Sequence, residues 1–107
     1  MCIRDRHNEL AKEWSGARFT DDQVKQCILE EAENSGIILD PHSAIGVLAG
    51  RKCRKTKNIP MIALATAHPA KFPEAVEDAT GVRPKLPPHL KDLMERPEQF
   101  DLSLIHI

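Results

Sequence analysis

Two short segments carry the side chains that are best suited to chemistry. The first, at positions 40–43, reads Asp-Pro-His-Ser, and the second, at positions 65–69, reads Ala-Thr-Ala-His-Pro. Together they hold a carboxylate, two hydroxyls and two imidazoles, the groups that proteins use to bind polar cofactors and transfer protons. A helix cap, a turn and two histidines with structural roles would give the same pattern, so spacing alone leaves both interpretations open.

Helices are expected to precede the first segment. The chain opens with the end of a helix at 7–14, and Thr20 and Gln23 then have the spacing of a capping box. The helix that follows should bury one apolar stripe, made up of Val24, Cys27, Ile28 and Ala32. Gly36 is expected to end this helix, and residues 37–39 form a short extended or buried connection.

A second helix is expected to begin within the first segment. Asp40 suits the N-cap and Pro41 the first helical position, where proline lacks only an N–H that would have no helical partner. The helix should run from position 42 to about 52. Its small residues leave room for another backbone or a ligand to approach closely, and they are Ala44, Gly46, Ala49 and Gly50.

The second segment is expected to follow a buried strand at 60–64, where every residue is apolar. Thr66 would then lie at or just beyond the carboxyl end of the strand, which is where open α/β sheets bind ligands. A short helix at 73–79 that ends at Gly81, and one or two helical turns at 90–95, complete the order. This alternation indicates an α/β fold.

Composition excludes several classes of function. The chain has 107 residues, a net charge of −1 and 4% aromatic residues, which gives no basis for binding nucleic acid or an anionic membrane. Cys27 and Cys53 lack the spacing of a disulfide framework or a zinc site, so we expect no metal and a cytoplasmic protein with reduced thiols. The basic run at 51–57 is interpreted as a solvated helix end, where cations complement the helix dipole.

The two ends of the chain indicate an origin different from that of its middle. One DNA sequence that encodes residues 1–5 also encodes residues 102–106 when it is read on the opposite strand. This DNA resembles the transposase mosaic end that is used to build sequencing libraries. We therefore expect residues 1–6 and 102–107 to be translated adapter, and residues 7–101 to be a window of a longer gene.

Two longer strings that contain these segments resemble the C-terminal part of threonine synthase. They are residues 38–47, ILDPHSAIGV, and residues 64–76, LATAHPAKFPEAV, in the same order and at the same separation as in that family. Residues 18–22 and 81–87 are similar too, so the resemblance covers essentially all of residues 7–101. The string at 65–69 is far more specific than a lone glycine motif.

The resemblance implies both a fold and a cofactor. Residues 7–101 would be the C-terminal part of the catalytic domain, a partial three-layer helix–sheet–helix domain of the fold-type-II, tryptophan synthase β-subunit-like enzymes. The implied cofactor is pyridoxal 5′-phosphate, bound by Ala65, Thr66, Ala67 and His68. Residues lining or supporting the pocket would be Asp40, His42 and Ser43. Thr66 matches the threonine whose hydroxyl faces the pyridine nitrogen, where a neutral group tunes the electron withdrawal of the ring.

The implied reaction is that of a lyase in threonine biosynthesis, which converts O-phospho-L-homoserine and water to L-threonine and phosphate. No catalytic residue is assigned, because the family places its Schiff-base lysine earlier in the chain. Lys71 lies within the motif, and Lys91 precedes an aspartate, but neither matches that lysine. The glycine-rich loop for the cofactor phosphate is also absent, so residues 7–101 should need the N-terminal part of the protein and be inactive alone.

Two other functions fit part of the sequence. Another pyridoxal-phosphate enzyme of the same fold type, such as a threonine or serine dehydratase, would differ in contacts to the substrate phosphate, which lie outside residues 7–101. A non-enzymatic small α/β module would use the basic run at 51–57 to bind a polyanion. Salt-sensitive retention on a polyanion column that depends on these Lys and Arg residues would indicate such a module.

Overall fold

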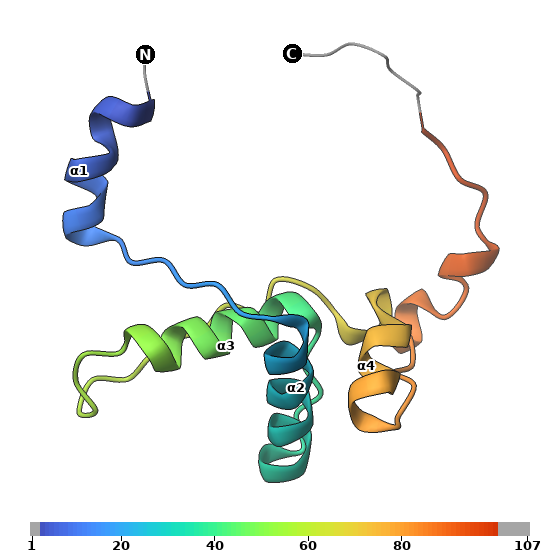
Figure 1. Cartoon of the computed structure of the whole chain (residues 1–107). Coiled ribbons are helices and arrows are strands. Elements are labelled where there is room, and N and C mark those ends of the chain that lie inside the picture. The colour runs from blue at the N-terminus through green and yellow to red at the C-terminus, as the bar shows by residue number, and fades with distance from the viewer. Residues whose placement is uncertain (1–2, 101–107) are drawn as a thin grey trace.

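The computed structural model describes residues 3–100, and their regular secondary structure is helical (Figure 1). The α-helices are α1 (Ile3–Glu13), α2 (Asp21–Ser35), α3 (Pro41–Cys53) and α4 (Pro73–Thr80). Short 3₁₀ turns occur at η1 (Pro69–Lys71), η2 (Pro88–Leu90) and η3 (Leu93–Glu95). The described residues contain no strand, and none of their helices is long and apolar enough to cross a membrane. Residues 102–107, expected to be translated adapter, lie outside the described range, as do the first two residues.

The predicted start and end of α2 are confirmed. The backbone N–H of Thr20 donates to Gln23 Oε1 over 2.9 Å, and the Gln23 N–H donates to the Thr20 hydroxyl over 3.4 Å. These reciprocal bonds satisfy N–H groups that have no partner within the helix. At the other end Gly36 has a φ of 72° and donates its N–H to the carbonyl of Ala32 over 3.1 Å. Glycine adopts this left-handed conformation without a Cβ clash, so the helix ends there.

The later helices follow the same local rules. Asp40 caps α3 and Pro41 is its first residue, as predicted. Helix α4 begins at Pro73 and ends at Gly81, whose φ is 72° and whose N–H donates to the carbonyl of Glu77 over 2.7 Å. The helical turn predicted within 90–95 is present as η3.

Helix α2 forms the centre of the core, because it packs against both α3 and α4. The central cluster of buried side chains is Val24, Cys27 and Ile28 of α2, with Ala44 of α3, and Ala70 of η1 and Val76 of α4 are buried as well. Half-buried apolar residues pack around them, namely Phe19, Leu39, Val47, Leu48 and Ala79. Three of the four residues of the apolar stripe predicted for α2 therefore face the core, whereas Ala32 is only half-buried and lies outside this cluster. Burial raises the pKa of the Cys27 thiol.

This core is small for a chain of this length. The accessible surface is 9577 Å², whereas a folded monomer of 12.0 kDa exposes about 6000 Å². The radius of gyration is 17.9 Å, against about 13 Å for a compact domain. Figure 1 shows the reason, because α1 and the chain beyond η2 extend away from the packed helices α2, α3 and α4.

The strand predicted at 60–64 is wrong for this structure. The segment is irregular, and its large side chains are exposed, with exposed fractions of 82% for Ile62 and 74% for Leu64. A strand needs a neighbouring strand to pair its N–H and C=O groups, and residues 3–100 supply none. The described part of the chain therefore lacks the sheet of the predicted α/β fold, and the three-layer arrangement stays a prediction.

The segment that contains residues 60–64 nevertheless runs along α3 where that helix has glycines. A Cβ placed on Gly46 would lie 3.8 Å from the carbonyl oxygen of Leu64, and one on Gly50 would lie 3.1 Å from Cγ of Met61. The small residues of α3 thus allow another backbone to approach closely, as the sequence predicted.

Two isoleucines of equal size test where the core lies. We expect Ile28→Ala to lower the free energy of unfolding by about 2–5 kcal/mol, because it leaves a cavity in place of a side chain that is only 1% exposed. Ile62→Ala removes the same atoms from an exposed site and should change the free energy of unfolding by less than about 0.5 kcal/mol. Urea unfolding of the 107-residue chain, followed by circular dichroism at 222 nm, measures both. Equal losses would contradict this location of the core.

The start of α4 provides a prediction about pH. The pKa of Glu74 lies below its ordinary value of 4.5 because its carboxylate accepts a backbone N–H of the helix start and a bond from Arg83. A depressed pKa stabilises the fold above the ordinary pKa, and this stabilisation is lost as the pH falls through the folded-state value. We expect Arg83→Gln to raise the pKa of Glu74, as measured by an NMR titration of its carboxyl carbon.

A matched variant serves as the control for this titration. Arg96 forms a similar ion pair with Asp92, with an Nη2 to Oδ1 distance of 2.8 Å, and lowers the pKa of that carboxyl. Arg96→Gln should therefore raise the pKa of Asp92 and leave that of Glu74 unchanged. A Glu74 pKa that is the same with and without Arg83 would show that the ion pair does not form in solution.

Candidate functional site

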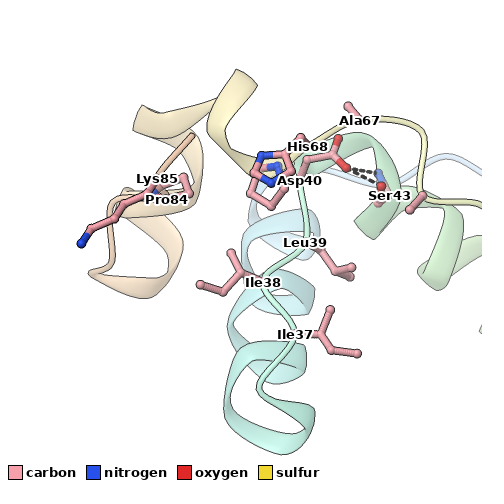
Figure 2. Close-up of a pocket in the computed structure, with 11 residues that line it drawn as sticks. Ile37, Ile38, Leu39, Asp40, Ser43, Ala67, His68, Pro84 and Lys85 are labelled. Atoms are coloured by element: carbon pink, nitrogen blue, oxygen red, sulfur yellow. Dashed lines mark hydrogen bonds between the residues drawn. The ribbon is translucent and has the colours of Figure 1, made fainter. Parts of the chain in front are cut away.

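A cavity of about 490 Å³ lies where the two segments meet, and Figure 2 shows it in close-up. Five of the residues singled out from the sequence line it, namely Asp40, Ser43, Ala65, Ala67 and His68. The volume is within the range of about 300–1,000 Å³ that is usual for small-molecule sites. The fold therefore brings together two segments that are separated in sequence by residues 44–64, which include most of α3.

Asp40 is the most constrained polar residue of the site, since only 1% of its surface is exposed. Its carboxylate accepts the backbone N–H of His42 over 2.9 Å, the backbone N–H of Ser43 over 3.3 Å, and the Ser43 hydroxyl proton. His42 Nδ1 lies 3.3 Å from the same carboxylate. Asp40 is therefore both the cap of α3 and a wall of the cavity, so the structural and functional interpretations of this segment coexist.

Ser43 connects the two segments directly. Its hydroxyl donates to Asp40 and accepts the backbone N–H of Thr66 over 3.2 Å. Within the described range, this is the one hydrogen bond that joins residues 60–67 to another part of the protein. The position of the second segment therefore depends on a hydroxyl in the first turn of α3.

Thr66 and His42 were predicted to be site residues, but neither lines the cavity. Thr66 is exposed and contributes its backbone N–H to the site through Ser43. The His42 ring packs on Phe72 instead, with ring centroids 4.8 Å apart and an angle of 46° between the ring planes. The capping bonds of Asp40 and this aromatic contact hold His42 at the edge of the site.

His68 combines a structural contact with a place in the cavity lining. Its Nδ1 accepts the backbone N–H of Ala70 over 3.1 Å and so caps the 3₁₀ turn η1. An imidazole nitrogen that accepts a hydrogen bond carries no proton, which leaves the ring proton of the neutral side chain on Nε2. His68 can therefore offer a hydrogen-bond donor to a bound ligand.

Sequence reasoning missed six residues of the lining, which are Ile37, Ile38, Leu39, Pro69, Pro84 and Lys85. The apolar run at 37–39 adjoins Asp40 and was expected to be extended or buried, so a signal for it existed. Pro84 and Lys85 gave no signal, because they reach the cavity only when the chain turns back after α4 (Figure 2). The amine of Lys85 points away from Asp40 and Ser43 in this view.

The basic run at 51–57 is largely occupied by contacts within the protein. Arg51 forms ion pairs with Glu30 and Glu31 of α2. Arg54 donates to three backbone carbonyls, those of Thr56, Lys57 and Ile59. Lys52 lies over the ring of Phe19, with Nζ 5.6 Å from its centroid. These contacts support the interpretation as a helix end rather than as a polyanion site.

The two lysines of the motif region lie elsewhere. Lys71 is exposed, with its Nζ 5.7 Å from the ring centroid of Phe72, and Lys91 is exposed beyond η2. Neither belongs to the cavity lining.

Comparison with known proteins identifies the family of the chain. Residues 43–103 match the family model "Threonine synthase, C-terminal". The matched range includes Ser43 and the whole second segment. Threonine synthase of Pseudomonas aeruginosa is 50% identical over 101 residues, covering 92% of this chain and 22% of the relative. That of Schizosaccharomyces pombe is 41% identical over 80 residues, covering 71% of this chain and 16% of the relative.

A solved structure gives the same result. The crystal structure of pyridoxal-phosphate-bound threonine synthase from Brucella melitensis superimposes with a TM-score of 0.78 and 47% sequence identity, over 87% of this chain and 20% of the other. The helices and connections described above thus have the arrangement of part of a pyridoxal-phosphate enzyme. The chain belongs to the threonine synthase family. It spans about a fifth of the length of the relatives it matches.

Two substitutions at Asp40 test its role as cap and wall. We expect Asp40→Ala to lower the free energy of unfolding by about 1–3 kcal/mol, because it leaves two N–H groups and a hydroxyl without their buried acceptor. Asp40→Asn keeps a capping oxygen and should lose less than half as much. Urea unfolding followed at 222 nm compares the two. If Asp40→Ala were as stable as the unsubstituted chain, the capping interaction would be refuted.

Proposed function

We propose that this chain acts as the C-terminal part of a threonine synthase, a pyridoxal-phosphate-dependent lyase that converts O-phospho-L-homoserine and water to L-threonine and phosphate. The observation that carries the proposal is its 47% identity and TM-score of 0.78 to a cofactor-bound threonine synthase. The activity belongs to the whole protein, of which this chain corresponds to about a fifth.

The residues around the cavity fit the proposed cofactor. A planar, polar cofactor needs apolar walls and a few placed polar groups. Ala65 and Ala67 offer small apolar walls, while His68 offers a polar ring nitrogen. We propose that Thr66, together with Ala65, Ala67 and His68, contacts the cofactor in the whole protein. When bound, pyridoxal phosphate supplies an electron-withdrawing ring that stabilises negative charge on the substrate carbons.

Thr66 has the chemistry expected of a partner for the ring nitrogen. Its hydroxyl is neutral and can donate or accept a hydrogen bond, so it does not force protonation of that nitrogen as a carboxylate would. The residue lies on a segment held at its backbone N–H, which leaves the hydroxyl available to a ligand. We assign no proton transfer to Asp40 or Ser43, whose hydrogen bonds are used within the protein, or to His42, whose ring packs on Phe72.

The remaining parts of the catalytic machinery are proposed to lie in the four-fifths of the relatives that this chain does not cover. They include the Schiff-base lysine and the loop that binds the cofactor phosphate. We also propose that residues 60–64 pair as a strand in the whole protein, within a three-layer domain. The exposure of Ile62 and Leu64 supports this, because apolar side chains of that size are usually covered. A cytoplasmic location remains our prediction, supported by the free thiols Cys27 and Cys53.

The competing functions receive less support. Each curated relative described above is a threonine synthase rather than a dehydratase. A polyanion-binding module would need basic side chains with room for a ligand, but three cations of the 51–57 run contact other groups of the chain.

A chimera tests the proposed function. Residues 7–101 of this chain replace the aligned part of the Pseudomonas aeruginosa relative, and phosphate release from O-phospho-L-homoserine is measured. We expect the chimera to form L-threonine and the 107-residue chain alone to release no phosphate. A soluble chimera that binds pyridoxal phosphate but releases none would refute the proposal. One that deaminates threonine instead would favour the dehydratase.

Thr66 can be tested in the same chimera. We expect Thr66→Val to lower kcat between about tenfold and hundredfold, since a hydrogen bond to a charged or polarised group contributes about 1.5–3 kcal/mol. Thr66→Ser keeps the hydroxyl and should retain most of the activity. Thr56→Val makes the same change at an exposed position remote from the cavity and should have no effect. A Thr66→Val chimera with unchanged kcat would remove Thr66 from the site.

A further inference from the structure

We propose that Ser43 and Asp40 are positioning residues for Thr66, and that Ser43 sets the location of the cofactor-contacting segment by accepting its backbone N–H. This inference rests on the proposed function for its catalytic consequence, whereas the hydrogen bonds themselves belong to the chain described here.

The direction of each hydrogen bond follows from the atoms present. A carboxylate only accepts hydrogen bonds, so the Ser43 hydroxyl proton must point to Asp40. The hydroxyl then presents only lone pairs elsewhere, and the Thr66 backbone N–H is a donor that matches them. A serine hydroxyl alone would rotate among partners. The hydrogen bond to Asp40 fixes the hydroxyl in the orientation whose lone pairs can accept the Thr66 N–H.

Asp40 is itself held in place. Its two oxygens accept the backbone N–H groups of His42 and Ser43 in the first turn of α3, and its surface is 1% exposed. Ser43 is 3% exposed, so water competes little for its hydroxyl. The orientation of the hydroxyl is thereby tied to the start of α3, whose Ala44 belongs to the core.

The second segment has few other constraints. Residues 61–66 are exposed, and no neighbouring strand within residues 3–100 pairs with them. The bond to Ser43 is the one described hydrogen bond from residues 60–67 to the remainder of the protein. Its loss should therefore change the segment that carries Thr66 while leaving the helical core intact.

Amide hydrogen exchange of the 107-residue chain tests the positioning directly. We expect Ser43→Ala to speed exchange of the Thr66 amide roughly three- to tenfold, which corresponds to the net contribution of one hydrogen bond. Ser43→Thr keeps the hydroxyl and should restore slow exchange. The amide of Ile28 in α2 reports whether the core stays folded in each variant.

A second serine provides a reciprocal control. The hydroxyl of Ser35 accepts the backbone N–H of Ile37 over 3.3 Å, the same kind of bond at another position. Ser35→Ala should speed exchange of the Ile37 amide and leave that of Thr66 unchanged. Ser43→Ala should speed exchange of the Thr66 amide and leave that of Ile37 unchanged. An unchanged Thr66 rate in Ser43→Ala, with Ile28 still protected, would overturn the proposal.

The consequence for the cofactor is tested in the chimera, through its affinity for pyridoxal phosphate and the absorption spectrum of the bound form. We expect Ser43→Ala to weaken binding roughly three- to tenfold and to shift the spectrum, with Ser43→Thr close to the unsubstituted chimera. Affinity and spectrum identical to those of the unsubstituted chimera would show that Ser43 does not position Thr66 for the cofactor. An unsubstituted chimera that is inactive would refute the proposed function, whereas the exchange results would still decide the positioning.

Discussion

The candidate site depends on the hydrogen bonds that the buried carboxylate of Asp40 accepts. This carboxylate accepts two backbone N–H groups at the start of α3 and the hydroxyl proton of Ser43, with 1% of the residue's surface exposed. Removing it would leave several polar groups buried without partners, which costs more free energy than the same loss at the surface. This one side chain caps the helix, lines the cavity and accepts the proton of the Ser43 hydroxyl, which in turn accepts the Thr66 N–H.

The size of the core explains why the rest of the protein is loosely arranged. Val24, Cys27, Ile28 and Ala44 form one small cluster, and most of the apolar side chains between Ile59 and Leu64 remain exposed. The relatives are more than four times as long as this chain, so most of their length has no counterpart here. An exposed apolar patch of this kind marks an interaction surface, and the proposed occupant is the remainder of the threonine synthase chain.

Local signals in the sequence predicted the helices well. Thr20 and Gln23 form the capping box, Asp40 and Pro41 begin α3, and Gly36 and Gly81 end their helices with positive φ. These features depend on residues within about one helical turn, so neighbours in sequence suffice to predict them. The conformation of residues 60–64 could not be predicted in the same way: the apolar run predicted a strand, but the hydrogen bonds of a strand require another strand, which residues 3–100 do not contain.

For the site, the residue types, the caps and the family resemblance of the two segments could be read from the sequence. The contact of Ser43 with Thr66, the packing of His42 on Phe72 and the completion of the cavity by Pro84 and Lys85 became apparent only in the folded chain. The difference arises from distance along the chain. A cap is formed by neighbouring residues, whereas the bond between Ser43 and Thr66 spans 23 positions and exists only because α3 and the returning segment lie side by side.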